Sequence, residues 1–195
     1  MQGVIDYITG NDPGACKLRD RYVFKIIPML NPDGVIIGNY RYRALTEFVR
    51  CSLSGHDLNR QWITPSSKLH PEIFYSKMMI RKTLDSREML FYCDFHGHSR
   101  NKNLFMYGNI IPRGPDRLKE RIFPMLMHKN SDHFNLHDCS FIVQKCKEST
   151  ARVVMWREFG LINSFTLECS FCGPTGGVYM DCHFTPSILL VRALS

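Results

Sequence analysis

The segment MLFYCDFHGHSR, residues 89–100, changes within a few positions from an apolar run to a polar cluster. Its first seven residues combine aromatic and aliphatic side chains and predict a buried β-strand. Asp94 comes near the end of that run, and His96 and His98 follow it. In sheets whose faces are covered by helices, chemistry gathers at the carboxyl ends of the strands. This cluster is therefore the first candidate for a functional site.

Further elements alternate in type on both sides of this segment. Residues 22–30, YVFKIIPML, predict another buried strand, and the NPDG that follows at residues 31–34 predicts a tight turn. Short apolar runs predict two more strands, and near-helical spacing of apolar residues predicts the helices between them. The strands are expected at 103–107 and 164–169, and the helices at 71–86, 116–129 and 150–159.

This alternation predicts an α/β fold with a mixed, mostly parallel sheet and helices on both faces. The 195 residues contain no internal repeat, low-complexity tract or linker, so we expect one unit. No apolar run approaches the roughly 20 residues that cross a membrane, and residues 1–8 lack the pattern of a secretory signal. The eight cysteines are scattered, which favours reduced thiols in a cytoplasmic protein.

The formal net charge of +7 favours an anionic partner. Lys and Arg are spread along the chain and no nucleic-acid-binding motif accompanies them, so nucleic acid is not expected as that partner. An acidic protein tail or peptide is the alternative that this charge leaves open.

Three groups of side chains have the chemistry of a site. His96 and His98 would lie on one face of an extended chain, and Asp94 is placed to orient an imidazole. Glu168 interrupts the apolar run SFTLEC, where a buried carboxylate needs either a cation or a task. Asn59 and Arg60, in DLNR, offer an amide beside a guanidinium that can grip a carboxylate in a bidentate manner.

Taken together, the ordered motifs resemble the zinc metallocarboxypeptidases, and in particular the cytosolic carboxypeptidase branch. The resemblance covers nearly the whole chain and rests on MLNPDGVIIGNYR, CSLSGHDLNRQW, YCDFHGHSRNKNLFMYG and ESTARVVMWREFG. It implies that the fold is that of a zinc carboxypeptidase and that the cofactor is Zn²⁺. It also implies removal of C-terminal or branched glutamates from acidic tails, with tubulin as the expected partner.

The resemblance further implies a role for each matching residue. His96 matches the third zinc ligand, and Glu168 matches the general base that activates water and then protonates the leaving amine. Asn59 and Arg60 match the pair that binds the terminal carboxylate of the substrate. Arg41 matches the arginine that polarises the scissile carbonyl.

For the substrate side-chain pocket we propose a basic residue that precedes the Glu168 strand. The candidates are Lys145, Lys147 and Arg152, with no spacing rule to choose among them.

The sequence also departs from the family pattern. The family takes its first two zinc ligands from an HxxE motif, and no His in these residues is followed three positions later by Glu. His70-Pro71-Glu72 is one residue too short and is not expected to bind metal. We therefore expect a C-terminal portion of a catalytic domain, cut at both ends, with two ligands upstream of Met1 and no activity by itself.

Residues 42–50, YRALTEFVR, are interposed where the family has no intervening residues. The insertion leaves Arg41 and Arg50 as rivals for the carbonyl-polarising role, and it is placed to displace Asn59 and Arg60. At the other end, SILLVRALS, residues 187–195, stands in place of the final helix of the family.

Two other functions remain open. Cys169 and Cys172 form a CxxC that Cys182 and His183 follow, which is compatible with a structural zinc knuckle of unusually short spacing. The chain is also compatible with a pseudoenzyme that binds acidic tails through Arg60 and a basic surface without cutting them.

Overall fold

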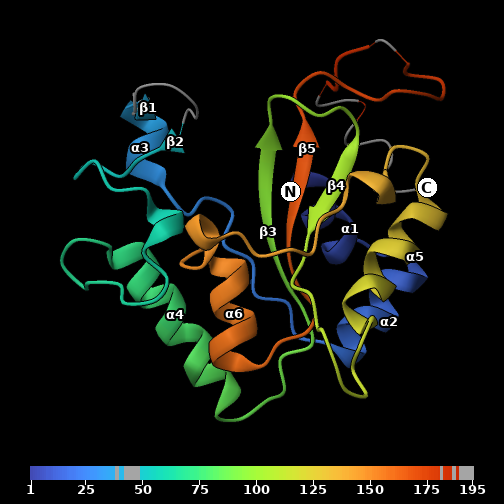
Figure 1. Cartoon of the computed structure of the whole chain (residues 1–195). Helices are drawn as coiled ribbons and strands as arrows, with labels where there is room; N and C mark the ends of the chain where they lie inside the picture. Colours follow the sequence, from blue (N-terminus) through green and yellow to red (C-terminus); the bar gives the residue numbers. More distant parts are fainter. Residues whose placement is uncertain (38–39, 42–48, 181, 186–187, 189–195) are drawn as a thin grey trace.

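The computed structural model of the chain describes residues 1–37, 40–41, 49–180, 182–185 and 188. A three-stranded sheet forms its centre, with helices packed around it (Figure 1). The strands are β3 (Tyr92–His98), β4 (Leu104–Tyr107) and β5 (Ser164–Ser170). The helices of the described residues are α1 (Gln2–Thr9), α2 (Pro13–Arg21), α3 (Pro32–Ile37), α4 (Pro71–Leu84), α5 (Ile122–Asn130) and α6 (Ala151–Phe159).

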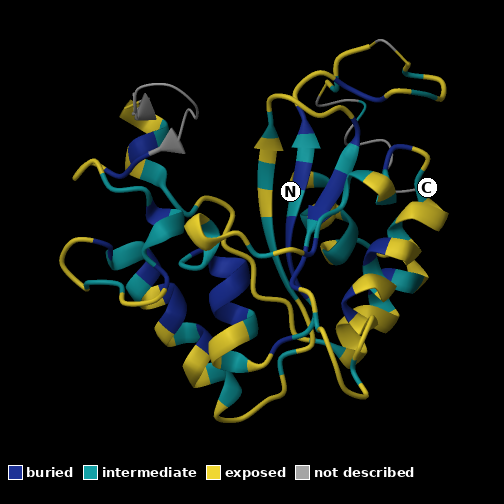
Figure 2. Cartoon of the chain, viewed as in Figure 1, coloured by how far each residue is buried: buried dark blue, intermediate teal, exposed yellow. Residues whose placement is uncertain are grey.

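The sheet is mixed, as its sequence predicts. Its strand order is β3-β5-β4, with β3 parallel and β4 antiparallel to β5. The central strand β5 is the most buried of the three, and Ser164 and Phe165 have no exposed surface. Figure 2 shows this burial in the middle of the sheet, while the outer sides of α4 and α5 are exposed. The predicted α/β class is confirmed.

Helices cover both faces of the sheet. Alternate side chains of each strand point to opposite faces, so each face has its own apolar cluster. One face carries Phe165 and Met106, which pack with Phe123 and Met127 of α5. The other face meets α6, whose Val154 and Met155 form a second cluster that Tyr92 of β3 joins. The active-site candidates of the sequence lie on this second face.

The predicted helices and three of the predicted strands are present, with shifted ends. The helix expected at 116–129 begins only at Ile122, after the 3-10 turn η2 (Lys119–Arg121). The strand expected at 89–95 begins at Tyr92 and continues through His98. The polar cluster DFHGH is therefore part of the strand itself rather than the loop that follows it.

Two predictions near the N-terminus are wrong. Residues 22–30 are extended but lie outside the sheet, and their apolar side chains are exposed, with Val23 60 % and Met29 50 % accessible. NPDG does not form a tight turn but opens the helix α3. Asn31 caps this helix, because its Oδ1 accepts from the Gly34 amide at 3.1 Å. A side chain at Gly34 would collide with Asn31 and the Cys51 carbonyl, which explains the glycine.

None of the helices in the described ranges has the length and apolarity that a membrane-spanning segment requires.

Candidate active site

Asp94, His96 and Glu168 share the face of the sheet that looks toward α6. His96 of β3 stands opposite Glu168 of β5 in the parallel register. Asp94 lies two residues before His96, so both side chains project from the same face. The pleat thus brings an imidazole between two carboxylates that are more than 70 residues apart in the chain.

The tautomer of His96 follows from its contact with Asp94. His96 Nε2 lies 2.9 Å from Asp94 Oδ2, and a carboxylate can only accept, so the imidazole carries its proton on Nε2. The lone pair of the neutral ring is then on Nδ1, which is the nitrogen that can bind a metal. A carboxylate behind a ligating histidine fixes ring orientation and raises basicity.

The charges around His96 determine its protonation. Burial alone would lower its pKa, but the hydrogen bond and charge of Asp94, with the charges of Glu168 and Asp57, raise it above the usual value. This concentration of negative charge favours a cation at the imidazole, which is the environment of a metal ligand.

Glu168 is almost fully buried, with 8 % of its surface accessible. Burial raises its pKa above the usual value, while the charge of His96 lowers it, Asp94 raises it and Lys147 lowers it. A carboxylate whose pKa is moved upward in this way accepts a proton more readily near neutral pH. Glu168 therefore has the properties of a general base.

Asn59 and Arg60 lie in the 3-10 turn η1 (Leu58–Arg60). Asp57 caps this turn, because its Oδ1 accepts from the Asn59 amide at 3.0 Å. The second oxygen of Asp57 lies 3.8 Å from Arg60 Nε, and the Arg60 side chain is 27 % accessible. The Asp57 contact orients the guanidinium while leaving it partly open to a ligand.

Asn59 connects this turn with both the sheet and α6. Its Nδ2 donates to Asp94 Oδ2 and lies as close to His96 Nε2, at 3.4 Å in each case. Its Oδ1 accepts from the Ala151 amide at 3.0 Å, which satisfies one of the donors at the start of α6. The structure thus brings Asn59 together with Asp94 and His96, as one site requires.

The side chain of Arg152 is not accessible to a substrate in this structure. Its guanidinium is buried and donates to the Gly108 carbonyl and, at 2.9 Å, to Asn109 Oδ1. Burial lowers its pKa to about 10. These contacts fasten α6 to the chain after β4, so the structure gives Arg152 a structural role instead of the predicted contact with substrate. Of the other two candidates, Lys147 is near enough for its charge to act on Glu168.

The arginine predicted to polarise the carbonyl lies at the border of the described residues. Arg41 belongs to the short strand β1 (Tyr40–Arg41), which pairs antiparallel with β2 (Val49–Arg50). The residues between them, 42–48, lie outside the described residues, as does most of the C-terminal segment 187–195. The choice between Arg41 and Arg50 stays a prediction.

Neither His70 nor the CxxC of Cys169 and Cys172 forms a metal site within the described residues. His70 accepts from the Ser66 amide through Nδ1 at 3.2 Å and contacts His56 Nδ1 through Nε2 at 3.1 Å, so both ring nitrogens are engaged. Across the described ranges, no three His, Cys, Asp or Glu side chains are grouped to hold a metal ion. The zinc-knuckle hypothesis therefore has no support in the geometry of the described residues.

Two residues of the site were missed by sequence reasoning. Asp57 belongs to the quoted DLNR motif, and an Asp directly before a helical turn is a recognisable capping signal. Lys77 is 3 % accessible and donates to the carbonyls of Trp62 and Ile63, at 2.7 and 2.8 Å, just after Arg60. No local sequence signal predicts that a lysine in the middle of α4 is buried.

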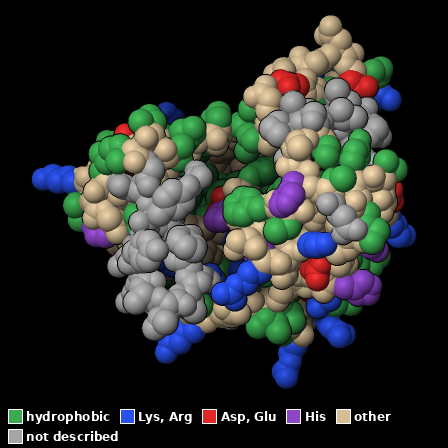
Figure 3. Space-filling view, turned by 90° about the horizontal axis from the view of Figure 1, so that it is seen from above, with side chains coloured by type: hydrophobic (Ala, Val, Ile, Leu, Met, Phe, Trp, Pro, Cys, Tyr) green, Lys and Arg blue, Asp and Glu red, His purple; other side chains and the backbone are tan. Residues whose placement is uncertain are grey.

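Seen from above, the molecule is hollowed between its two halves (Figure 3). Histidine and acidic side chains are visible at the wall of the hollow, and Lys and Arg project around the outline of this face. Basic residues are therefore spread around the face rather than gathered in one stripe.

The fold and the site define a class: an α/β protein in which an imidazole stands between two carboxylates on one face of a mixed sheet. The family model described as zinc carboxypeptidase matches residues 1–135. The chain belongs to the zinc carboxypeptidase family.

Within that family, the chain is similar to the cytosolic carboxypeptidases. It is 52 % identical to mouse cytosolic carboxypeptidase 2 over 186 residues, which are 95 % of this chain and 20 % of that protein. It is 48 % identical to bovine cytosolic carboxypeptidase 3, with 94 % of this chain and 18 % of that protein covered. The chain thus spans about a fifth of the length of these relatives, and the resemblance to this branch is confirmed.

Solved structures agree on the fold. A metallo-carboxypeptidase from Burkholderia cenocepacia superposes with a TM-score of 0.67 and 25 % identity, over 87 % of this chain and 42 % of that one. A metallo-carboxypeptidase from Pseudomonas aeruginosa superposes with a TM-score of 0.66 over 87 % of this chain and 43 % of that one, at 21 % identity, which supports the fold alone.

Proposed function

We propose that this chain carries the general base and part of the substrate site of a zinc-dependent carboxypeptidase. The observation that supports this most directly is the arrangement of Asp94, His96 and Glu168 on one face of the sheet. The similarity to cytosolic carboxypeptidases supports the same reaction class. Cytoplasmic location is part of this proposal, in agreement with the names of those relatives.

The residues described here fit one zinc ligand and do not complete a site. His96 offers Nδ1, whereas catalytic zinc takes three protein ligands and keeps one position open. Zinc bound there would act as a Lewis acid and would bring the pKa of water down to about 7. The remaining ligands would have to come from outside the described residues, as the missing HxxE motif predicts.

The residues of this chain would act in order on a peptide C-terminus. Arg60, with Asn59, binds the terminal carboxylate and so places the last peptide bond beside Glu168. Glu168 takes a proton from the attacking water and returns it to the leaving amine. An arginine of the 41–50 region, Arg41 or Arg50, would meet the negative charge that develops on the carbonyl oxygen.

For the substrate we propose acidic tails that end in glutamate, such as those of tubulin. The net charge of +7 favours an anionic peptide, and Lys147 is a cation close to Glu168. Lys147 is therefore the candidate that we retain for the glutamate side chain.

The test is release of glutamate from a peptide that ends in several glutamates, measured with zinc on a protein that contains this chain together with the segment that supplies the remaining ligands. Glu168→Gln keeps the shape of the side chain and removes the base, so activity should fall by roughly 10²–10⁴-fold. Peptide binding should survive this substitution, whereas Arg60→Ala should weaken it. Full activity of Glu168→Gln would sink the proposed mechanism.

A binding protein without activity is the second candidate, because the described residues contain only one ligand of a zinc site. It predicts that a chelator leaves peptide binding unchanged and that no glutamate is released with any metal supplied. Metal-dependent release would decide for the enzyme.

A further inference from the structure

The segment that follows β5 carries two cysteines that the proposed function does not use. Cys172 comes two residues after the end of β5, and Cys182 follows ten positions later. Both are exposed free thiols. Figure 1 shows the segment that carries them beyond the carboxyl end of β5. Exposure leaves both sulfurs accessible to oxidants and to other thiols.

The backbones around these two cysteines are in contact. Gly173 has a φ of +100°, and a side chain at this position would collide with the Cys182 carbonyl. Nδ1 of His183 lies 3.1 Å from the carbonyl oxygen of Phe171. The contacts run in opposite order along the two stretches of chain, as in an antiparallel pair. Facing residues of such a pair have Cα atoms about 4.5–5.5 Å apart, and a disulfide spans about 4.4–6.8 Å, so Cys172 and Cys182 are placed to react with each other.

The nearer cysteine of the CxxC is a poorer partner for Cys172. Cys169 lies inside β5, which pairs with a strand on each side of it. The Phe171 amide continues this pairing with a hydrogen bond of 3.0 Å to the His98 carbonyl. Because a strand rises about 3.3 Å per residue, Cys169 and Cys172 are roughly 10 Å apart along such a chain, beyond the reach of a disulfide.

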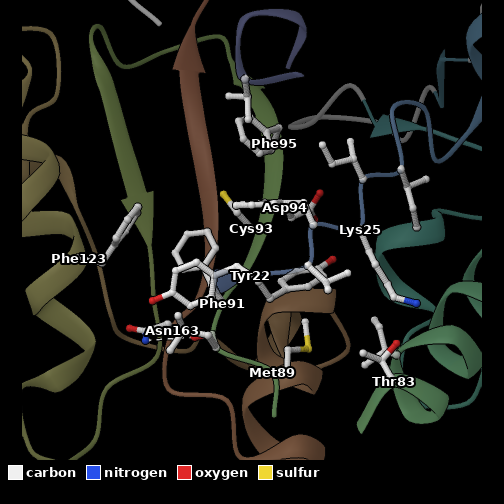
Figure 4. Close-up of a pocket in the computed structure, with 18 of the residues that line it drawn as sticks. Tyr22, Lys25, Thr83, Met89, Phe91, Cys93, Asp94, Phe95, Phe123 and Asn163 are labelled. Carbon is white, nitrogen blue, oxygen red and sulfur yellow. Dashed lines mark hydrogen bonds between the residues drawn. The ribbon is translucent and has the colours of Figure 1, made fainter. Parts of the chain in front are cut away.

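Cys93 shows the contrast between an exposed and an enclosed thiol. Figure 4 shows Cys93 between Phe91 and Phe95 along β3. Burial raises the pKa of this thiol to about 12, so it stays protonated and unreactive at physiological pH. Exposure and a backbone contact between the two stretches of chain occur together at Cys172 and Cys182.

We propose that Cys172 and Cys182 form a reversible disulfide when the protein meets a peroxide, and that this bond restrains the segment between them. One thiolate attacks hydrogen peroxide and takes up an oxygen as sulfenic acid, while the other oxygen leaves as hydroxide and becomes water. The second sulfur attacks the sulfenic sulfur, so that the S–S bond forms, the S–O bond breaks and a second water leaves. Two thiols and one peroxide thus give one disulfide and two waters, and two electrons pass from sulfur to the peroxide.

The disulfide would act next to the candidate active site. Phe171, directly before Cys172, lies so close to Gly97 that a side chain at Gly97 would collide with its ring. Gly97 separates His96 from His98 in β3. A bond at Cys172 therefore restrains the backbone that places the Phe171 ring beside these histidines. An exposed disulfide is readily reduced again, which suits transient redox control in a reducing cytosol.

The test treats the whole reduced chain with hydrogen peroxide and then blocks the remaining thiols with iodoacetamide. Chymotrypsin cleaves after Tyr179, between the two cysteines, so digestion of the denatured protein without reductant should give one cross-linked pair of peptides that holds Cys172 and Cys182. Dithiothreitol should separate this pair by thiol–disulfide exchange. In the oxidised protein, amide exchange at residues 173–180 should slow at least severalfold, because a closed loop opens less.

Four variants test which sulfurs react. Cys172→Ser and Cys182→Ser should each abolish the cross-link, and the remaining thiol should then stop at a sulfenic acid that dimedone traps. Cys146→Ser, at another exposed cysteine, is the matched control and should form the cross-link in the same yield as the parent chain. Cys169→Ser should also retain it. The disulfide does not depend on the proposed enzymatic activity, and every measurement is made without zinc.

Three results would overturn the proposal. One is oxidation of Cys172 and Cys182 to separate sulfenic acids without a cross-link. Another is a main product that joins Cys169 to Cys172 or joins two chains. The third is a disulfide between Cys172 and Cys182 that leaves amide exchange at residues 173–180 unchanged, which would contradict a restraint on this segment.

Discussion

We expect partial burial to slow the reactions of individual thiols in this protein. Burial raises the pKa of Cys93 to about 12 and that of Cys139 to about 11, with the negative charges of Asp94 and Asp138 adding to it. The thiolate is the reactive form, so both side chains remain thiols at physiological pH. Cys146, Cys172 and Cys182 are exposed.

Alkylation with iodoacetamide at pH 8 should therefore discriminate among the cysteines. Cys146, Cys172 and Cys182 should react first, and Cys93 and Cys139 at least about tenfold more slowly, since a pKa difference of one unit changes the thiolate fraction about tenfold. Mass spectrometry of peptides after timed quenching measures the rates. The same reaction in denaturant is the control, where all five should react alike, and equal rates in the native protein would contradict the raised pKa of Cys93.

The environment of His70 should make stability depend on pH. Burial and the charge of His56 lower the pKa of His70 below its usual value of 6.5, while Glu72 acts in the opposite direction. The unfolded chain therefore binds this proton more readily than the folded one. The stabilisation is complete above about pH 6.5 and is lost as the pH falls below it toward the folded pKa.

Urea unfolding at pH 7.5 and pH 5.5 should show this loss as a lower free energy of unfolding at the acidic pH. His70→Gln removes the titrating group, so its free energy of unfolding should change less between the two pH values. His183→Gln, at an exposed position, is the matched control and should behave as the parent chain does. An unchanged pH dependence in His70→Gln would exclude this residue as the source.

At the level of the elements, one buried lysine joins α4, α6 and the segment after η1. Lys77 Nζ donates to the Trp62 and Ile63 carbonyls and, at 2.8 Å, to Glu158 Oε1 of α6. These three acceptors satisfy the ammonium group, which explains how a charge is tolerated at 3 % accessibility. The segment so anchored begins two residues after Arg60.

Lys77→Met should lower the free energy of unfolding by about 1–3 kcal/mol, because buried carbonyls lose their donor. Lys82→Ala, on the exposed side of the same helix, should change it by no more than about 0.5 kcal/mol. Denaturant titration of both variants measures the difference. Equal stability of Lys77→Met and the parent chain would mean that water replaces the ammonium group.

At the level of the whole molecule, charge should govern the first encounter with an acidic tail. A net charge of +7 attracts a polyanionic peptide over a distance that salt shortens, to about 8 Å at physiological ionic strength. Affinity for a peptide that ends in several glutamates should fall at least severalfold when NaCl rises from about 50 to 300 mM. A peptide of equal length that ends in glutamines is the control, and an equal salt response of both would contradict the electrostatic contribution.

The fold class, the main helices and strands and the family could be predicted from the sequence itself. The apolar runs of β3, β4 and β5 and the helical spacing of α4 and α6 are local patterns, so they predicted the α/β class and the main elements. The ordered motifs around Asn59, Arg60, His96 and Glu168 predicted the family. Both kinds of signal lie in short stretches of chain, where side-chain period and residue type are sufficient.

Tertiary structure alone decided where buried and charged groups end up. Residues 22–30 have the composition of a core strand, yet they are exposed because no neighbouring strand in the described residues pairs with them. Arg152 has the charge for a substrate pocket, yet its guanidinium is bound to Gly108 and Asn109. The burial of Lys77 and the link from Asn59 to Asp94 likewise depend on contacts between distant segments. Composition shows what a segment can bury, but only the packing of the other segments determines whether a partner is there.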